Sequence, residues 1–205
     1  MDDSLTPLHT VSEPTGSDAT EADARAAHLA DLRAGCETAF RAVYEAEKGC
    51  VYGLLLRLTA NPALTADLFQ NVWLKLAKHH RQLRPDTNLR AWLCTVARNE
   101  WLSQRRAERV DMSRIFTFGL QQTAQHVDAF MAESLDVLNA LNRLSDADRE
   151  VLVLSSVTQL ASEQVAAALE LNSAALRQRL SRARQRLQQE LERAEAAEKT
   201  LAGLL

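Results

Sequence analysis

Apolar residues recur at the spacing of an α-helix in two separate parts of the chain. Near the C-terminus, one stripe of apolar positions continues for several turns, which predicts a helix with one face packed against a core. Its members are Leu176, Leu180, Ala183, Leu187 and Leu191. A shorter apolar face precedes the stripe, and Asn172 or Ser173 is expected to cap the second helix at its start. The pattern predicts a helix-turn-helix over residues 162–187.

The second part lies in the N-terminal half of the chain. The pattern of residues 66–106 predicts two amphipathic helices joined by a polar loop around residues 85–88. An earlier apolar face within residues 40–58 is expected to pack beneath them, and Asn61 with Pro62 ends it. The three tryptophans are expected in the core: Trp73, Trp92 and Trp101. We therefore expect a second small helical unit.

The polar side of the C-terminal helix favours a nucleic-acid partner. The stretch from Arg177 to Arg186 contains five arginines, and no acidic residue interrupts it. Guanidinium groups can bind phosphates, and Gln or Arg side chains near a helix start can reach base edges in the major groove. A solvated surface helix is the alternative for a basic run of this kind.

Composition agrees with an all-α protein of two small helical domains. The chain has 205 residues, of which 46% are hydrophobic, with only six Gly and four Pro. No segment approaches the roughly 18 consecutive apolar residues of a membrane span. The N-terminus lacks the basic start and apolar core of a signal peptide. We therefore expect a cytoplasmic protein without a membrane partner.

Charge is distributed unevenly along the chain. Residues 1–24 contain six acidic residues and no Lys or Arg, so the rest of the chain carries a net charge of +3 although the whole carries −3. The acidic tail has little apolar periodicity and is expected to be disordered. A DNA partner is compatible with the basic remainder.

The residues that could carry other chemistry are few. Cys36, Cys50 and Cys94 are widely spaced and odd in number, which favours reduced thiols over a disulfide framework. His79 and His80 have no metal-ligand spacing with other residues. Phosphate-binding Gly loops, a nucleophile elbow and paired catalytic acids are also missing from the sequence. We expect no metal, no cofactor and no enzymatic activity.

The chain resembles bacterial sigma factors in two places. The first matches region two: Asp67, Leu68, Gln70, Val72, Trp73, Arg90, Ala91, Trp92, Leu93, Ala97, Arg98, Asn99, Arg105 and Arg106. The second matches region four, from Leu135 to Leu154 and then at Glu163, Val165, Ala166, Leu169, Ser173, Arg179, Leu180, Arg182, Ala183 and Arg184. Both matches occur in the family's order and together span roughly residues 36–192. The chain is most similar to the small extracytoplasmic-function (ECF) group.

The resemblance implies an alternative sigma factor that binds core RNA polymerase and promoter DNA. It implies polymerase contacts at Asp67, Leu68, Gln70 and Trp73. It implies contacts to the −10 element, which region two opens, at Arg84, Asp86, Asn88, Arg90, Arg98, Asn99, Arg105 and Arg106. It implies contacts to the −35 element, which region four reads, at Ser173, Ala174, Arg177, Gln178, Arg179, Arg182, Arg184 and Arg186.

The same resemblance sets the expected domain boundaries. They are an acidic tail at 1–24, region two at 25–106, a linker at 107–130, region four at 131–194 and a C-terminal tail at 195–205. An anti-sigma protein or a Ser/Thr kinase is the expected regulator.

The polymerase-contact helix departs from the family pattern. The family commonly has several acids in this helix, but here Asp67 is the only one. Ala66 precedes it, and Asn71 follows Gln70. Thr65 is therefore a candidate phosphorylation site, because a phosphate would add about −1.5 to −2 charge beside Asp67. The alternative is that Thr65 caps a helix beginning near Ala66.

The region-four match departs from the family in its turn. Glu170 stands where Gly is usual, which would cost about 1 kcal/mol if the backbone there needs a positive φ. Ala174 and Ala175 replace the family's Gly-Thr, and Ser103 replaces an Asp in region two. The promoter sequence that this chain recognises therefore cannot be inferred from its relatives. Two alternatives stay open: a helix-turn-helix regulator acting without polymerase, and a degenerate sigma-like adaptor.

Overall fold

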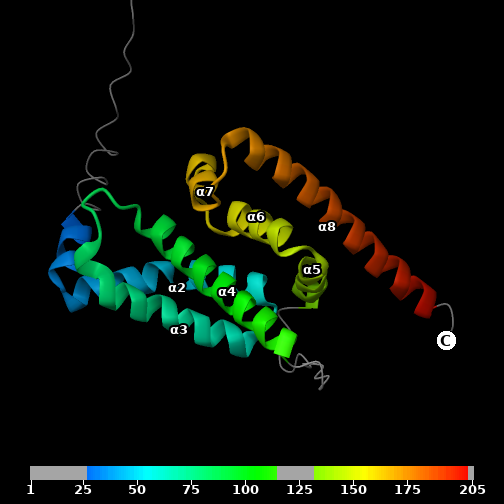
Figure 1. Ribbon diagram of the computed structural model, residues 1–205, viewed down its shortest axis with the longest axis horizontal. Coiled ribbons are helices and arrows are strands. Elements are labelled where there is room, and N and C mark those ends of the chain that lie inside the picture. Colours follow the sequence, from blue (N-terminus) through cyan, green and yellow to red (C-terminus); the bar gives the residue numbers. More distant parts are fainter. Residues whose placement is uncertain (1–26, 115–131, 203–205) are drawn as a thin grey trace, which may run out of the picture.

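The protein is described here by a computed structural model covering residues 27–114 and 132–202, and every element in those ranges is helical (Figure 1). This confirms the all-α prediction. The predicted acidic tail, residues 115–130 of the predicted linker and residue 131 at the predicted start of region four lie outside the described residues. Within those same ranges, no helix is long and apolar enough to cross a membrane, and no three His, Cys, Asp or Glu side chains cluster as metal ligands would.

The N-terminal bundle comprises residues 27–114. A helix at residues 27–34 precedes α2 (Glu37–Thr59), α3 (Pro62–His79), the short 3₁₀ helix η1 (His80–Gln82) and α4 (Leu89–Arg114). Figure 1 shows α2, α3 and α4 side by side.

A sharp turn between α2 and α3 sets the geometry of this bundle. Ala60 has a φ of 50°, and its N–H donates to the Leu56 carbonyl at 2.9 Å. The Asn61 side chain accepts hydrogen bonds from the N–H groups of Ala63 and Leu64, and Pro62 occupies the first helical position. These are ordinary helix-start signals, so the predicted break at Asn61 and Pro62 is confirmed.

The C-terminal bundle comprises residues 132–202. It contains α5 (Ala132–Arg143), α6 (Asp146–Val157), α7 (Ser162–Ala168) and α8 (Ser173–Ala202). Asn172 Oδ1 accepts from the Ala175 N–H at 2.8 Å, so Asn172 is the cap of α8, one of the two residues that the sequence allowed. At 30 residues, α8 is about 45 Å long. It packs on α5, α6 and α7 along the outer side of the molecule (Figure 1).

Both long helices extend further than the sequence pattern indicated. α4 continues to Arg114, so the linker predicted from residue 107 begins inside this helix. α8 continues to Ala202, beyond the predicted end of region four at residue 194. Apolar periodicity fades before these helices end, which explains why the pattern stopped early.

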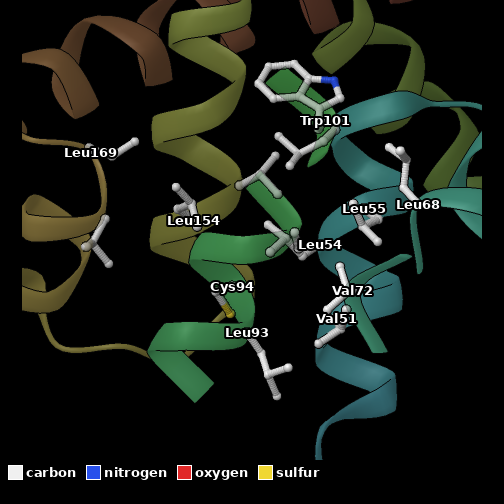
Figure 2. Close-up of a cluster of buried hydrophobic side chains, with 14 of the residues drawn as sticks. Val51, Leu54, Leu55, Leu68, Val72, Leu93, Cys94, Trp101, Leu154 and Leu169 are labelled. Atoms are coloured by element: carbon white, nitrogen blue, oxygen red, sulfur yellow. The ribbon is translucent and has the colours of Figure 1, made fainter. Parts of the chain in front are cut away.

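The two bundles share one hydrophobic core. α6 packs on α2, and α7 packs on α4. Figure 2 shows Leu54 and Leu93 of the N-terminal bundle in the same cluster as Leu154 and Leu169 of the C-terminal bundle. Trp101 is 1% exposed, which confirms its predicted core position. We call this packing of the two bundles the closed arrangement.

One buried side chain, Arg149 of α6, joins the ends of two helices across the closed arrangement. It is 4% exposed, and its guanidinium donates to the carbonyl of Leu58 near the end of α2 at 2.8 Å. It also donates to the carbonyls of Leu141 at 2.9 Å and Asn142 at 2.7 Å, in the last turn of α5. A cation is favourable at helix C-termini, where carbonyls lack intrahelical partners. Burial lowers the pKa of the Arg149 guanidinium.

The turn between α7 and α8 is strained. Glu170 has a φ of 56°, a conformation that costs a side-chain-bearing residue about 1 kcal/mol. We expect Glu170→Gly to raise the free energy of unfolding by about 1 kcal/mol, measured by urea denaturation. Glu163→Gly, within α7, serves as a control that should lower it by a similar amount. A destabilised Glu170→Gly protein would contradict the strain.

Candidate polymerase and nucleic-acid interfaces

The exposed side of α3 combines one acid, one amide and one large apolar residue. Asp67, Gln70 and Leu74 are exposed and lie three and four residues apart, which places them along one stripe of the helix. Leu74 is 58% exposed, so it is not part of the core and its side chain is accessible to a partner. Leu74 is not among the predicted contacts, although its position on the polar side of an amphipathic helix was a usable signal in the sequence. We call these three residues the α3 stripe.

Two of the four predicted polymerase contacts do not lie on this surface. Leu68 is 4% and Trp73 is 7% exposed, because both face the core of the N-terminal bundle. The Trp73 ring packs against those of Tyr44 and Phe69, with centroid separations of 4.8 and 5.8 Å. The prediction that Leu68 and Trp73 contact the polymerase directly is therefore wrong for this structure. Both side chains pack in the core behind the α3 stripe.

The proposed phosphorylation site is not accessible in this structure. Thr65 is fully buried, and its hydroxyl lies 2.8 Å from the Asn61 carbonyl and 2.7 Å from the Thr59 hydroxyl. A kinase would have to open the start of α3 to reach it. Thr65 is not the cap either, because α3 begins at Pro62 with Asn61 as its cap. The prediction that Thr65 caps the helix is therefore wrong, and the burial of its hydroxyl gives no support to phosphorylation in the folded chain.

We expect Thr65→Glu to report on folding rather than on phosphorylation. The variant buries a carboxylate without a matched partner and should lower the free energy of unfolding by about 3 kcal/mol or more. Ala66→Glu is the matched control, because Ala66 is exposed and the same charge there should change stability by no more than about 0.5 kcal/mol. Urea unfolding of both variants gives the comparison, and equal stabilities would contradict the burial of Thr65.

The loop before α4 presents a small polar group. Arg84 and Asp86 are exposed and form a two-point ion pair, with both N···O distances at 3.1 Å. Asn88 instead caps α4, since its Oδ1 accepts from the Ala91 N–H at 3.0 Å. Arg84 and Asp86 therefore remain available to a DNA strand, whereas the Asn88 side chain has a structural role.

Predicted DNA contacts on α4 face the C-terminal bundle in the closed arrangement. Arg98 pairs with Glu150 of α6, and their side chains are 15% and 8% exposed. Arg105 pairs with Asp146, also of α6, at 3.2 Å. The charges that would bind DNA phosphates are thus held by carboxylates of the other bundle.

The remaining α4 positions differ in how far they are covered. Arg90 pairs with Glu47 at 2.8 Å, which raises the pKa of Arg90, and donates to Gln159 beyond α6 at 3.1 Å. Asn99 and Arg106 are exposed. The closed arrangement therefore covers this DNA-binding surface only in part.

The basic surface of α8 is open. Most of the predicted contacts to the −35 element are exposed: Ser173, Ala174, Arg177, Gln178, Arg182, Arg184 and Arg186. Arg179 is partly buried. A hollow of about 330 Å³ separates α8 from the start of α6, and Gln178, Arg179 and Arg182 line its α8 side. Arg186 pairs with Asp148 of α6, so its guanidinium braces the helix-turn-helix. The prediction of an outward basic face on this helix is confirmed.

Comparison with known families matches both bundles. Residues 43–110 match sigma-70 region 2, and residues 134–187 match sigma-70 region 4. The RNA polymerase sigma factor CarQ of Myxococcus xanthus is 30% identical over 151 residues, which are 72% of this chain and 86% of CarQ. The ECF RNA polymerase sigma factor SigL of Mycobacterium tuberculosis is 31% identical over 68% of this chain and 81% of SigL. The chain belongs to the ECF sigma factors.

This ECF sigma factor also has relatives that share less with it. The probable RNA polymerase sigma factor RfaY of Xanthomonas campestris is 29% identical over 171 residues, and the chain spans 43% of its length. Among solved structures, the sigma factor RpoE of Bartonella quintana, crystallised with the anti-sigma factor NepR, aligns with a TM-score of 0.67 and 27% identity. That match covers 75% of this chain and 96% of RpoE. CnrH, solved with the cytosolic domain of CnrY, shares the fold at a TM-score of 0.62 and 20% identity.

Proposed function

We propose that this ECF sigma factor binds core RNA polymerase and directs transcription from its own set of promoters. The observation that carries the proposal is that one chain presents an exposed, acid-bearing α3 stripe and a separate basic helix-turn-helix. The role is binding rather than bond-making, and it would be performed in the cytoplasm.

Each surface has a distinct task in this proposal. The α3 stripe offers Asp67 to a basic polymerase surface and Leu74 to an apolar one. The N-terminal half of α8 enters the major groove of the −35 element, where Arg177 and Gln178 reach base edges and the flanking arginines contact phosphates. The loop at Arg84 and Asp86 receives an extruded −10 base, and unstacking that base costs a few kcal/mol.

Use of the −10 surface requires the bundles to separate at α6. Arg98 and Arg105 bind DNA phosphates only after they leave Glu150 and Asp146. The closed arrangement is therefore a resting form, and assembly with polymerase and promoter favours an open one.

An anti-sigma protein is the regulator that the fold supports best. The structure of RpoE, which this chain matches along most of its length, was determined with an anti-sigma factor bound. Control by a kinase at Thr65 receives no support, because that hydroxyl is buried.

Run-off transcription with core RNA polymerase tests the proposal. The template is a fragment from upstream of the protein's own gene, and core affinity is measured in parallel. We expect a specific transcript with the wild-type protein and an about tenfold weaker core affinity with Asp67→Ala, since a charge-assisted contact is worth about 1.5 kcal/mol. Ala66→Glu, which adds an acid beside Asp67, should strengthen core binding.

The alternatives predict different results in the same experiment. A sigma-like adaptor would bind core without supporting a transcript from any promoter fragment offered. A regulator that acts without polymerase would bind the DNA fragment alone and would fail to bind core in every variant. Glu163→Ala removes an exposed acid from the other bundle and should behave as wild type.

A further inference from the structure

A polar hollow of about 330 Å³ lies between the start of α6 and the first half of α8, two helices that pack on each other. We call it the α6–α8 hollow. The residues that line it are Ser145, Ala147, Asp148, Leu171, Ala175, Gln178, Arg179, Arg182 and Arg186. Its volume lies at the small end of the range for ligand pockets, roughly 300 to 1,000 Å³. The hollow can therefore take a small ion or a head group, but not a large ligand.

The helical spacing of α8 divides its five arginines between two flanks. At about 100° per residue, Arg179 and Arg186 lie on the flank that faces the start of α6. Arg182 lies beside them at the outer edge of the same flank. Arg177 and Arg184 lie on the opposite flank, and neither lines the hollow. Three guanidinium groups therefore gather around one concave site.

The charges of the α6–α8 hollow are only partly balanced. Arg186 is bound to the Asp148 carboxylate, which also accepts a hydrogen bond from the Ser145 hydroxyl at 2.7 Å. Among the side chains that the structure describes, none pairs with Arg179 or Arg182. Arg179 is also half-buried, and taking a charge out of water without a partner is unfavourable. The site therefore favours an anion that comes from outside the chain.

The start of α6 increases the positive potential of the hollow. Ser145 caps this helix of 12 residues, and Ala147 of its first turn lines the hollow. The first N–H groups of a helix lack intrahelical acceptors, and the helix dipole places partial positive charge there. Asp148 offsets part of this potential, but three guanidinium groups and one carboxylate leave a net charge of +2.

A small anion suits the hollow better than the backbone of a duplex does. Duplex phosphates meet the exposed cations of a recognition helix, and Arg177 and Arg184 are exposed in this way. Arg179 is the one half-buried arginine of the five. A duplex therefore reaches Arg179 least, whereas a small ion inside the hollow can contact it directly.

We propose that the α6–α8 hollow binds a small polyvalent phosphate anion, such as pyrophosphate or the polyphosphate group of a nucleotide, through Arg179 and Arg182. A guanidinium group can bind phosphate through two parallel N–H···O bonds, and a phosphate with several free oxygens can accept from both arginines at once. Arg182 is also a predicted contact to the −35 element, so the bound anion competes with promoter DNA. This competition rests on the proposed function, whereas binding of the anion does not.

Isothermal titration calorimetry of the full-length protein with inorganic pyrophosphate, in the absence of DNA, tests the proposal. We expect one site per chain in the wild-type protein. Arg179→Ala and Arg182→Ala should each weaken the affinity about tenfold, because each removes a charge-assisted contact to phosphate. Arg177→Ala and Arg184→Ala remove the same charge from the opposite flank, where salt screens it from the hollow, and should stay within about twofold of wild type.

Two results of this titration would overturn the proposal. A wild-type protein that does not bind pyrophosphate leaves the hollow, at most, as a contact for DNA phosphates. An equal loss of affinity in all four variants shows only a general attraction to a basic helix. Circular dichroism confirms that each variant folds, and Arg182→Ala, whose side chain is exposed, carries the test if Arg179→Ala does not fold.

A duplex from upstream of the protein's own gene tests the competition. At constant ionic strength, saturating pyrophosphate should weaken the duplex affinity of the wild-type protein about fivefold, as measured by fluorescence anisotropy. The same addition should leave the duplex affinity of Arg179→Ala unchanged, because that variant no longer holds the anion. An equal effect on both proteins would contradict competition at the hollow. A protein that binds pyrophosphate in this pattern but supports no run-off transcript would overturn the proposed function and leave the anion site standing.

Discussion

Replacing Arg149 by leucine is expected to lower the free energy of unfolding by about 3 kcal/mol. The guanidinium donates to the carbonyls of Leu58, Leu141 and Asn142, which close the ends of two helices. Leucine fills part of the volume but donates nothing, so these buried carbonyls lose their partner. Urea denaturation monitored by circular dichroism gives the value.

Two further variants identify the cause of that loss. Arg143→Leu removes an exposed arginine from the end of α5 and should cost no more than about 0.5 kcal/mol. Arg149→Lys keeps a buried cation with fewer donors and should fall between leucine and wild type. If Arg149→Leu is as stable as Arg143→Leu, the guanidinium does not hold the bundles together.

Reversing the charge of Glu150 is expected to open the closed arrangement. Glu150→Lys places a like charge against Arg98 in a largely buried site, and losing one partner of a buried pair costs about 3 to 5 kcal/mol. This cost shifts the ratio of closed to open molecules by at least about a hundredfold. Small-angle X-ray scattering should show a larger radius of gyration than wild type.

The swapped pair tests whether the effect belongs to this contact. Arg98→Glu combined with Glu150→Lys restores opposite charges and should recover most of the compactness, although Arg98 is then lost as a DNA contact. Glu163→Lys, on an exposed part of α7, should scatter as wild type. A Glu150→Lys protein that stays compact would show that the apolar seam alone maintains the closed arrangement.

Local signals in the sequence were enough for the helices and for the DNA-facing side of α8. The break at Asn61 and Pro62, the cap of α8 and the apolar stripes depend on residues a few positions apart, so they can be seen in the chain itself. The positive φ of Glu170 is also a local property. It could be expected from the sequence, because the family usually has Gly at this position.

Contacts between the bundles could not be predicted in this way. The charged start of α6 has the pattern of a solvated helix end, yet Asp148, Arg149 and Glu150 are 4 to 6% exposed. Each has a partner far along the chain, at Arg186, Leu58 and Arg98 respectively, and nothing in the local pattern indicates which surface will cover them. For the same reason, the local pattern does not show that the Thr65 hydroxyl is buried.

The contact between Arg149 and Leu58 also sets an order of events during translation. The two residues are 91 positions apart, and a ribosome adds about 5 to 20 residues per second. The end of α2 and its apolar seam therefore emerge about 5 to 18 s before the arginine that covers them. During that interval the nascent N-terminal bundle exposes the surface that α6 later covers, and chaperones that bind apolar segments have their best access to it then.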